Sequence, residues 1–125
     1  MFNVEWQEAE RVWAASPNII AVWVFGSAQD GQIKPGSDLD IAALFETMPS
    51  LDEQANLRAD LQQALQVDEI DLLILNQANP IVRFEAISGR SIFCRDRGRR
   101  AEFASLTARE YEDEMALLTR WVKAR

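Results

Sequence analysis

Residues 19–45 read Ile-Ile-Ala-Val-Trp-Val-Phe-Gly-Ser, then ten residues rich in turn formers, then Asp-Leu-Asp-Ile-Ala-Ala-Leu-Phe. The first run, Ile19 to Phe25, is continuous, β-branched and aromatic, which predicts a strand buried on both faces. Gly26 permits a sharp exit from that strand and a close approach of the backbone to a ligand, and Ser27 adds a hydroxyl there. The stretch therefore predicts a strand, a phosphate-binding turn and a second strand that begins with two carboxylates.

From Asp38 onward, the residues alternate with the period of two that is typical of a β-strand. In such a strand Asp38 and Asp40 face the same side, about 6 to 7 Å apart. A further strand is expected over residues 67–75, where Asp71 interrupts an apolar run. A carboxylate inside such a run is costly unless it is paired, hydrogen-bonded or bound to a cation.

These three aspartates are the candidates for a divalent-metal site. Mg²⁺ prefers hard oxygen ligands and is commonly shared between one or two carboxylates and the phosphates of a substrate. Gly26 and Ser27 are the candidates for holding those phosphates, through N–H and hydroxyl donors. Taken alone, an Asp-X-Asp pair is more often a solvated strand end and Gly-Ser is usually only a turn, so the weight lies in their combination.

Helices and one more strand are expected around this stretch. Asn3 is predicted to cap an N-terminal helix that ends at Ser16-Pro17. Ser50 to Glu53 forms a capping box, which predicts a helix over residues 51–66. The later elements are a short helix between Asn79-Pro80 and Gly89, an edge strand at Ser91 to Cys94, and a final helix in which Tyr111 and Trp121 are either core aromatics or partner contacts.

Composition limits the class of protein. A chain of 125 residues predicts one compact domain over residues 1–125. No apolar run approaches the roughly 20 residues of a membrane span, no signal peptide is visible, and the single Cys94 excludes an internal disulfide. A cytoplasmic location is therefore expected. The net charge of -7 argues against a general nucleic-acid binder, whose affinity comes from basic side chains.

Histidine is absent from the chain. Its absence excludes Ser-His-Asp hydrolysis, Cys-His catalysis and zinc sites built on histidine. Carboxylates, hydroxyls and oxygen-ligated metal are what remain for catalysis.

The combination of Gly26-Ser27, ten intervening residues, Asp38-Leu39-Asp40, a helix and a strand bearing Asp71 resembles the signature of the DNA polymerase β-like nucleotidyltransferase superfamily. The short length resembles its minimal nucleotidyltransferase (MNT) group. The resemblance implies an α+β fold, with a mixed, mostly antiparallel sheet of about four strands flanked by helices. It also implies that the three aspartates are catalytic and bind Mg²⁺, and that Gly26 and Ser27 bind the nucleoside triphosphate.

MNT proteins are typically paired with a HEPN-domain protein in toxin–antitoxin modules. The resemblance therefore implies an antitoxin that transfers AMP from ATP to a HEPN ribonuclease toxin, in a hetero-oligomer with it. Asp40 or Asp71 would assist deprotonation of the acceptor hydroxyl. Two alternatives stay open: an antitoxin that masks its toxin by binding alone, and a transferase for a small hydroxylated molecule, which the short chain disfavours.

One departure from the family pattern concerns the loop after the turn. Many relatives carry Gly-Ser-Arg-Ala-Arg-Gly there, whereas this chain has Gly-Ser-Ala-Gln-Asp-Gly at residues 26–31. Two positive charges are missing, and Asp30 adds a negative one. Either nucleotide affinity is weakened, or arginines at position 90 and in the 95–100 cluster substitute; a solvated polar turn is the other interpretation of that cluster.

Overall fold

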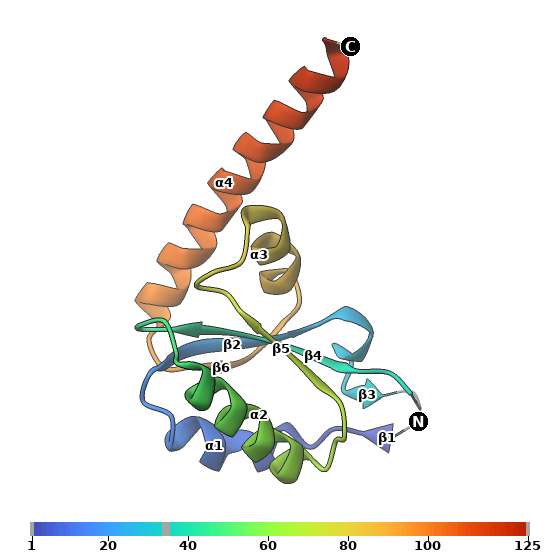
Figure 1. Ribbon diagram of the computed structural model, residues 1–125, viewed down its shortest axis with the longest axis vertical. Helices are drawn as coiled ribbons and strands as arrows, with labels where there is room; N and C mark the ends of the chain where they lie inside the picture. Colours follow the sequence, from blue (N-terminus) through green and yellow to red (C-terminus); the bar gives the residue numbers. More distant parts are fainter. Residues whose placement is uncertain (1, 34–35, 125) are drawn as a thin grey trace.

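The computed structural model describes residues 2–33 and 36–124, and its centre is a four-stranded sheet (Figure 1). The strands are β2 (Ile19–Phe25), β4 (Leu39–Phe45), β5 (Ile70–Ile74) and β6 (Arg90–Cys94), in the order β5-β4-β2-β6. Strand β2 runs antiparallel to both β4 and β6, and β4 runs parallel to β5. The predicted α+β class, with a mixed and mostly antiparallel sheet, is confirmed.

Helices cover both faces of this sheet (Figure 1). One face packs against α1 (Glu10–Ala14), which follows the 3₁₀ turn η1 (Trp6–Ala9), and against α2 (Leu51–Leu65). The opposite face packs against α3 (Pro80–Ile87) and α4 (Arg97–Lys123). The two central strands are buried between these layers, which is why their sequences are almost continuously apolar.

The alternation along β4 assigns each side chain to one of the two layers. Ile41 and Ala43 belong to the core cluster on the α1 and α2 side, whereas Ala42 and Leu44 belong to the cluster that contains Ala86 of α3. Asp40 is two residues before Ala42, so its carboxylate faces the side of the sheet that α3 and α4 cover.

Capping residues fix where the helices begin. The Ser50 hydroxyl accepts a hydrogen bond from the Glu53 amide at 3.0 Å, and the Asn79 side chain accepts one from the Val82 amide at 2.9 Å. Both caps were predicted. A capping box also predicts that the Glu53 side chain reaches back to the Ser50 amide. That part of the prediction is wrong, because the Glu53 carboxylate instead accepts a hydrogen bond from the Asn18 side chain. Asp96 caps α4, which the sequence did not indicate.

The predicted start of the N-terminal helix is also wrong. Asn3 lies in a short strand, β1 (Phe2–Asn3), which pairs with β3 (Gln32–Ile33) inside the segment that was expected to be a loop. The Val4 amide donates to the Gly31 carbonyl at 2.6 Å. Pairing between segments about thirty residues apart outweighs a local capping signal, and the helix begins only at η1. Pro35, expected in the same loop, lies outside the described residues.

The last helix is the longest, and it extends well beyond the sheet and α3 (Figure 1). Tyr111 in its middle stacks on Phe84 of α3 with ring centroids 4.0 Å apart, so it is a packing aromatic, whereas Trp121 near its end is exposed. In the part of the chain that the structure describes, no helix combines the length and the apolar character that crossing a membrane requires.

Candidate functional site

The turn after β2 lies directly against one of the predicted site aspartates. Gly26 has φ +73° and opens a short 3₁₀ turn, η2 (Gly26–Ala28), while Ser27 is exposed beside it. A side chain built at Gly26 would collide with Oδ2 of Asp40. Glycine is therefore required twice here, by the left-handed backbone and by the neighbouring carboxylate.

Asp40 and Asp71 are brought together by the sheet. They are partners in the parallel register of β4 with β5, and Phe25, the last residue of β2, is the partner of Asp40 on its other side. Asp71 is exposed rather than buried, so the cost expected for a carboxylate inside an apolar run does not arise at its position. The sheet thus places two carboxylates side by side, next to the glycine turn.

Asp38 differs from the expectation in its local structure. Strand β4 begins at Leu39, so Asp38 is the exposed residue just before it and not a member of the strand. Its charge nevertheless acts on Asp40, so the three predicted aspartates share one electrostatic environment.

The pKa of the Asp40 carboxyl is raised above its ordinary value of 3.8. The largest cause is burial, which disfavours the charged form, followed by the negative charges of Asp71, Asp38 and Glu85. The site therefore concentrates negative charge that the protein itself does not neutralise.

Glu85 is the site residue that the sequence analysis missed. It is the only acidic residue of α3, which is a weak signal in a sequence. Its proximity to Asp40 depends on how α3 packs over the sheet, and no local pattern encodes that placement.

The carboxylates suit a hard cation. Among residues 2–33 and 36–124, no three ligating side chains converge closely enough to hold a metal ion by themselves. Such a cage is not required for Mg²⁺, which commonly takes one or two carboxylates and completes its shell with water and substrate phosphates. The mutual repulsion that raises the pKa of Asp40 is what a bound cation would relieve. The donor set therefore fits Mg²⁺.

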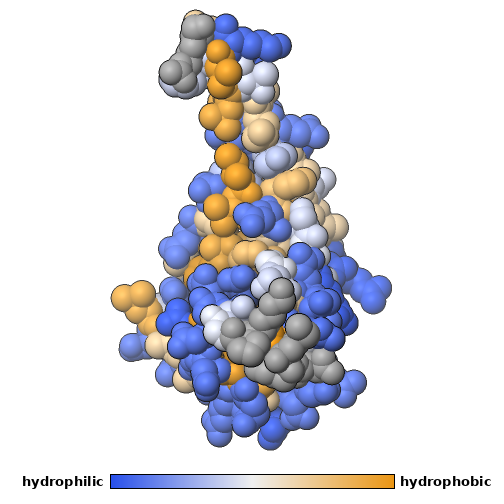
Figure 2. All heavy atoms as spheres, turned by 90° about the vertical axis from the view of Figure 1, so that its right-hand side faces the viewer, coloured by the Kyte–Doolittle hydropathy of each residue, from blue (hydrophilic) through white to orange (hydrophobic). Residues whose placement is uncertain are grey.

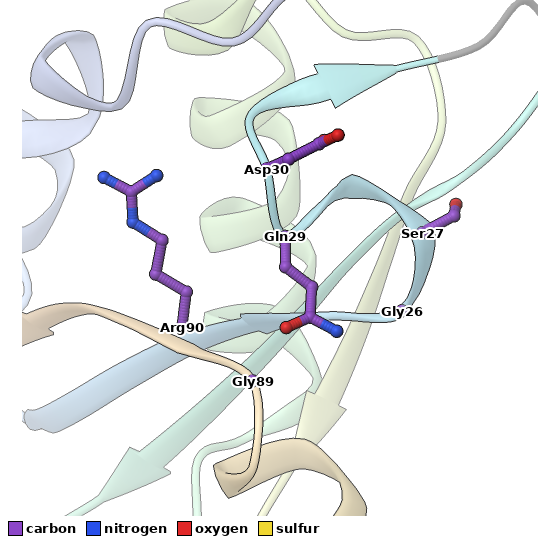
Figure 3. Close-up of a pocket in the computed structure, with 6 residues that line it drawn as sticks. All are labelled: Gly26, Ser27, Gln29, Asp30, Gly89 and Arg90. Carbon is purple, nitrogen blue, oxygen red and sulfur yellow. The ribbon is translucent and has the colours of Figure 1, made fainter.

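A pocket of about 510 Å³ opens beside the turn (Figure 3). Its lining comes from the turn and from the start of β6: Gly26, Ser27, Gln29, Asp30, Gly89 and Arg90. A side chain at Gly89 would collide with the Val24 carbonyl, so this glycine lets the chain pass close against β2. In Figure 3, Gln29 extends toward Gly26 and Gly89, whereas Arg90 extends away from Ser27.

Among the described residues, Arg90 is the basic residue that lines this pocket. Within the described residues, the Arg90 side chain forms no hydrogen bond or ion pair. Three other arginines named as possible substitutes are engaged elsewhere: Arg95 donates to the carbonyls of Ile19, Trp13 and Ser16, Arg99 pairs with Glu46, and Arg100 donates to the Ser91 hydroxyl. Of the arginines that the sequence offered as substitutes, Arg90 is the one that lines the pocket in the described part of the chain.

Several solved structures resemble this fold. One is a chain of a crystal structure of a toxin–antitoxin with AMP-PNP, with a TM-score of 0.80 and 20% identity, covering 96% of this chain and 97% of that chain. A second comes from the tri-AMPylated Shewanella oneidensis HEPN toxin in complex with MNT antitoxin, with a TM-score of 0.73 and 18% identity, covering 95% of this chain and 93% of that one. A third is a putative minimal nucleotidyltransferase, with a TM-score of 0.57 and 28% identity, covering 67% of this chain and 87% of that chain.

A comparison with curated proteins found no match. The family model described as "Polymerase beta, Nucleotidyltransferase" matches residues 7–98, a segment that contains the glycine turn, the three aspartates and Glu85. This match spans most of the 125 residues, and the chain therefore belongs to the polymerase β nucleotidyltransferase family.

Proposed function

We propose that this chain acts over residues 1–125 as a single minimal nucleotidyltransferase domain, and that with Mg²⁺ it transfers AMP from ATP to a cognate HEPN-domain toxin. Membership of the nucleotidyltransferase family supports the reaction class. The likeness to chains from toxin–antitoxin structures, one with AMP-PNP and one with a tri-AMPylated HEPN toxin, supports the nucleotide and the acceptor. In this proposal the protein is an antitoxin that works in the cytoplasm, in a hetero-oligomer with the toxin it neutralises.

The observation that carries the proposal is the contact between Gly26 and Asp40. A side chain at Gly26 would overlap the Asp40 carboxylate, so the phosphate-binding turn and the carboxylates form one continuous site. In the proposal, Gly26 and Ser27 hold the triphosphate by backbone N–H and hydroxyl donors. The reacting phosphate then lies beside the carboxylates.

Asp38, Asp40 and Asp71 are proposed as the ligands of Mg²⁺ and as the catalytic residues. When bound, the ion neutralises phosphate charge and lowers the pKa of the attacking hydroxyl. Asp40 or Asp71 takes the proton of that hydroxyl. The raised pKa makes Asp40 a stronger base than an ordinary aspartate. The acceptor oxygen bonds to the α-phosphorus of ATP, the bond from that phosphorus to the bridging oxygen breaks, and pyrophosphate leaves.

The test is transfer of label from α-labelled ATP to the purified toxin. The double variant Asp38→Ala/Asp40→Ala should lose transfer, whereas Asp60→Ala, which removes an exposed carboxylate from α2 on the opposite face, should retain it. Mass spectrometry of the toxin should show the mass of one or more AMP groups. A wild-type protein that suppresses the toxin without any transfer would establish neutralisation by binding alone.

A further inference from the structure

Helix α4 extends beyond the part of the domain on which it packs (Figure 1). Its first half is anchored: the Phe103 ring lies 6.4 Å from that of Trp23, Thr107 is fully buried, and Tyr111 stacks on Phe84 of α3. The helix has 27 residues, which makes it about 40 Å long at 1.5 Å per residue. From Met115 onward, every described residue is exposed. About two turns of helix thus stand clear of the domain (Figure 1).

The protruding part is not polar, as a solvated helix end would be. Met115, Leu118 and Val122 are 39%, 46% and 61% exposed, and their spacing of three and four residues places them on one face. We refer to these three residues as the α4 stripe. Tyr111 is four residues before Met115, so the stripe continues the face that packs on α3. Figure 2 shows an apolar band running along the protruding helix.

We propose that the α4 stripe is the docking surface for the protein that accepts AMP, through an apolar helix face of that acceptor. This inference rests on the proposed function for the identity of the acceptor. What it adds is the surface of this chain that holds the acceptor. An aligned apolar face on a helix that has left its own domain is typical of a protein interface.

Most of α4 lies outside the segment that the family model matches. The matched segment ends at residue 98, where α4 has just begun. The toxin–antitoxin chain with AMP-PNP nevertheless covers 96% of this chain, which leaves out about 5 of 125 residues and therefore includes most of α4. The helix thus belongs to the fold shared with that chain, although most of it lies outside the family match.

The position of α4 favours the acceptor over a second copy of this chain as the occupant. Helices α3 and α4 cover the face of the sheet toward which Asp40 projects. A protein held along the α4 stripe and the outer side of α3 therefore stands on the carboxylate side of the molecule. This placement suits a protein whose hydroxyl must reach the carboxylates, whereas a contact between two copies does not require it.

The charge beside the stripe specifies the partner further. Glu112 and Asp113 are exposed at the point where the helix leaves the body, and Glu114 follows them. Since complementary charges steer association and set register, the acceptor surface is expected to carry lysine or arginine next to its apolar face. The proposed partner surface is therefore an apolar helix face with a basic border.

Calorimetric binding to the purified HEPN toxin tests the surface directly. Leu118→Glu should raise the dissociation constant about 100-fold and Leu118→Ala about 10-fold, because each removes an anchor from the centre of the α4 stripe. Leu51→Glu is the matched control, since Leu51 is 82% exposed at the start of α2 on the opposite face. It should bind as the wild type does. The exchange Glu112→Lys/Asp113→Lys should weaken binding and reduce its dependence on salt.

Transfer kinetics separate docking from chemistry. Leu118→Glu should raise KM for the toxin while kcat at saturating toxin and KM for ATP stay at wild-type values. Wild-type binding by Leu118→Glu overturns the inference. So does light scattering in which the wild type is a dimer, Leu118→Glu a monomer, and toxin binding equal for both. If the stripe variants lose binding but the wild type transfers no AMP, docking stands and the proposed enzymatic function fails.

Discussion

Asp40 lies directly opposite Asp71 in the parallel pairing of β4 with β5. Two like charges on neighbouring strands repel each other, and no residue in the described part of the chain forms an ion pair with either. The arrangement raises the pKa of Asp40 and therefore opposes folding at neutral pH. A cation bound between the two carboxylates would relieve this repulsion, in keeping with the proposed site for Mg²⁺ and a triphosphate.

The first prediction concerns stability. Because the pKa of Asp40 is raised in the folded protein, protonated Asp40 favours the fold below its ordinary pKa of 3.8, and this contribution is lost as the pH rises through the raised value. Asp40→Asn should therefore raise Tm by a few degrees at pH 7 in EDTA. Thermal unfolding followed by circular dichroism measures it. The advantage should shrink as the pH is lowered, and a variant less stable than wild type at pH 7 would contradict the account.

A second prediction separates backbone strain from collision at Gly26. Gly26→Ala places a methyl group against Asp40 at φ +73°, whereas Gly36→Ala meets nothing within 4 Å at a similar φ of +79°. Both substitutions should cost about 1 kcal/mol or more of unfolding free energy through the left-handed backbone. Only Gly26→Ala should also reduce AMP transfer, by about 100-fold, because it displaces the turn from the carboxylate. Denaturant unfolding and the labelled-ATP assay give the two readouts. Equal loss of transfer in both variants would show that the contact between Gly26 and Asp40 has no specific role in transfer.

A third prediction assigns different roles to two arginines. Arg90→Ala should weaken ATP binding about 10-fold, because among the residues that the structure describes Arg90 alone brings a positive charge to the pocket lining. Arg95→Ala should leave the ATP affinity unchanged and lower Tm instead, because Arg95 donates to main-chain carbonyls at 2.8 and 3.0 Å. Calorimetry with AMP-PNP and thermal unfolding provide the comparison. Wild-type nucleotide affinity in Arg90→Ala would show that the phosphates are held without it.

A fourth prediction concerns the negative charge that Asp30 adds to the same pocket. The Asp30 carboxylate accepts a hydrogen bond from the Gln32 amide at 2.9 Å, so Asp30→Asn removes the charge and keeps an acceptor. ATP should bind several-fold more tightly to this variant at low salt, with a smaller gain at high salt because the effect is electrostatic. Asp68→Asn, an exposed carboxylate away from the pocket, is the matched control. No change at low salt would contradict a role for Asp30 in limiting affinity.

Restoring the arginines of the family pattern is not equivalent at the two positions. Ala28 is 2% exposed and belongs to the core cluster on the α1 and α2 side. An arginine there would have to bury its guanidinium or move the turn. Asp30 is exposed and has room for a longer side chain. The burial of Ala28, which a comparison of sequences alone does not reveal, therefore makes position 28 the harder of the two to restore.

Local signals in the sequence predicted much of the secondary structure correctly. The bounds of β2 follow from a continuous apolar run closed by glycine, and the starts of α2 and α3 follow from the caps at Ser50 and Asn79. These features depend on neighbours within a few residues. The helix expected from Asn3 failed, because the partner of that segment is a strand about thirty residues away.

By itself, the sequence limited the chemistry that this protein could carry out: it has no histidine, and it has a glycine turn and three aspartates that predict a site for oxygen-ligated Mg²⁺. Only the tertiary structure decided how these parts meet. It paired Asp40 with Asp71 and placed Gly26 against the Asp40 carboxylate. It also placed Glu85 of α3 close enough to act on Asp40, and it left the end of α4 exposed. The reason is physical, since residue types fix which bonds are possible, whereas strand register and helix packing fix which groups are close enough to form them.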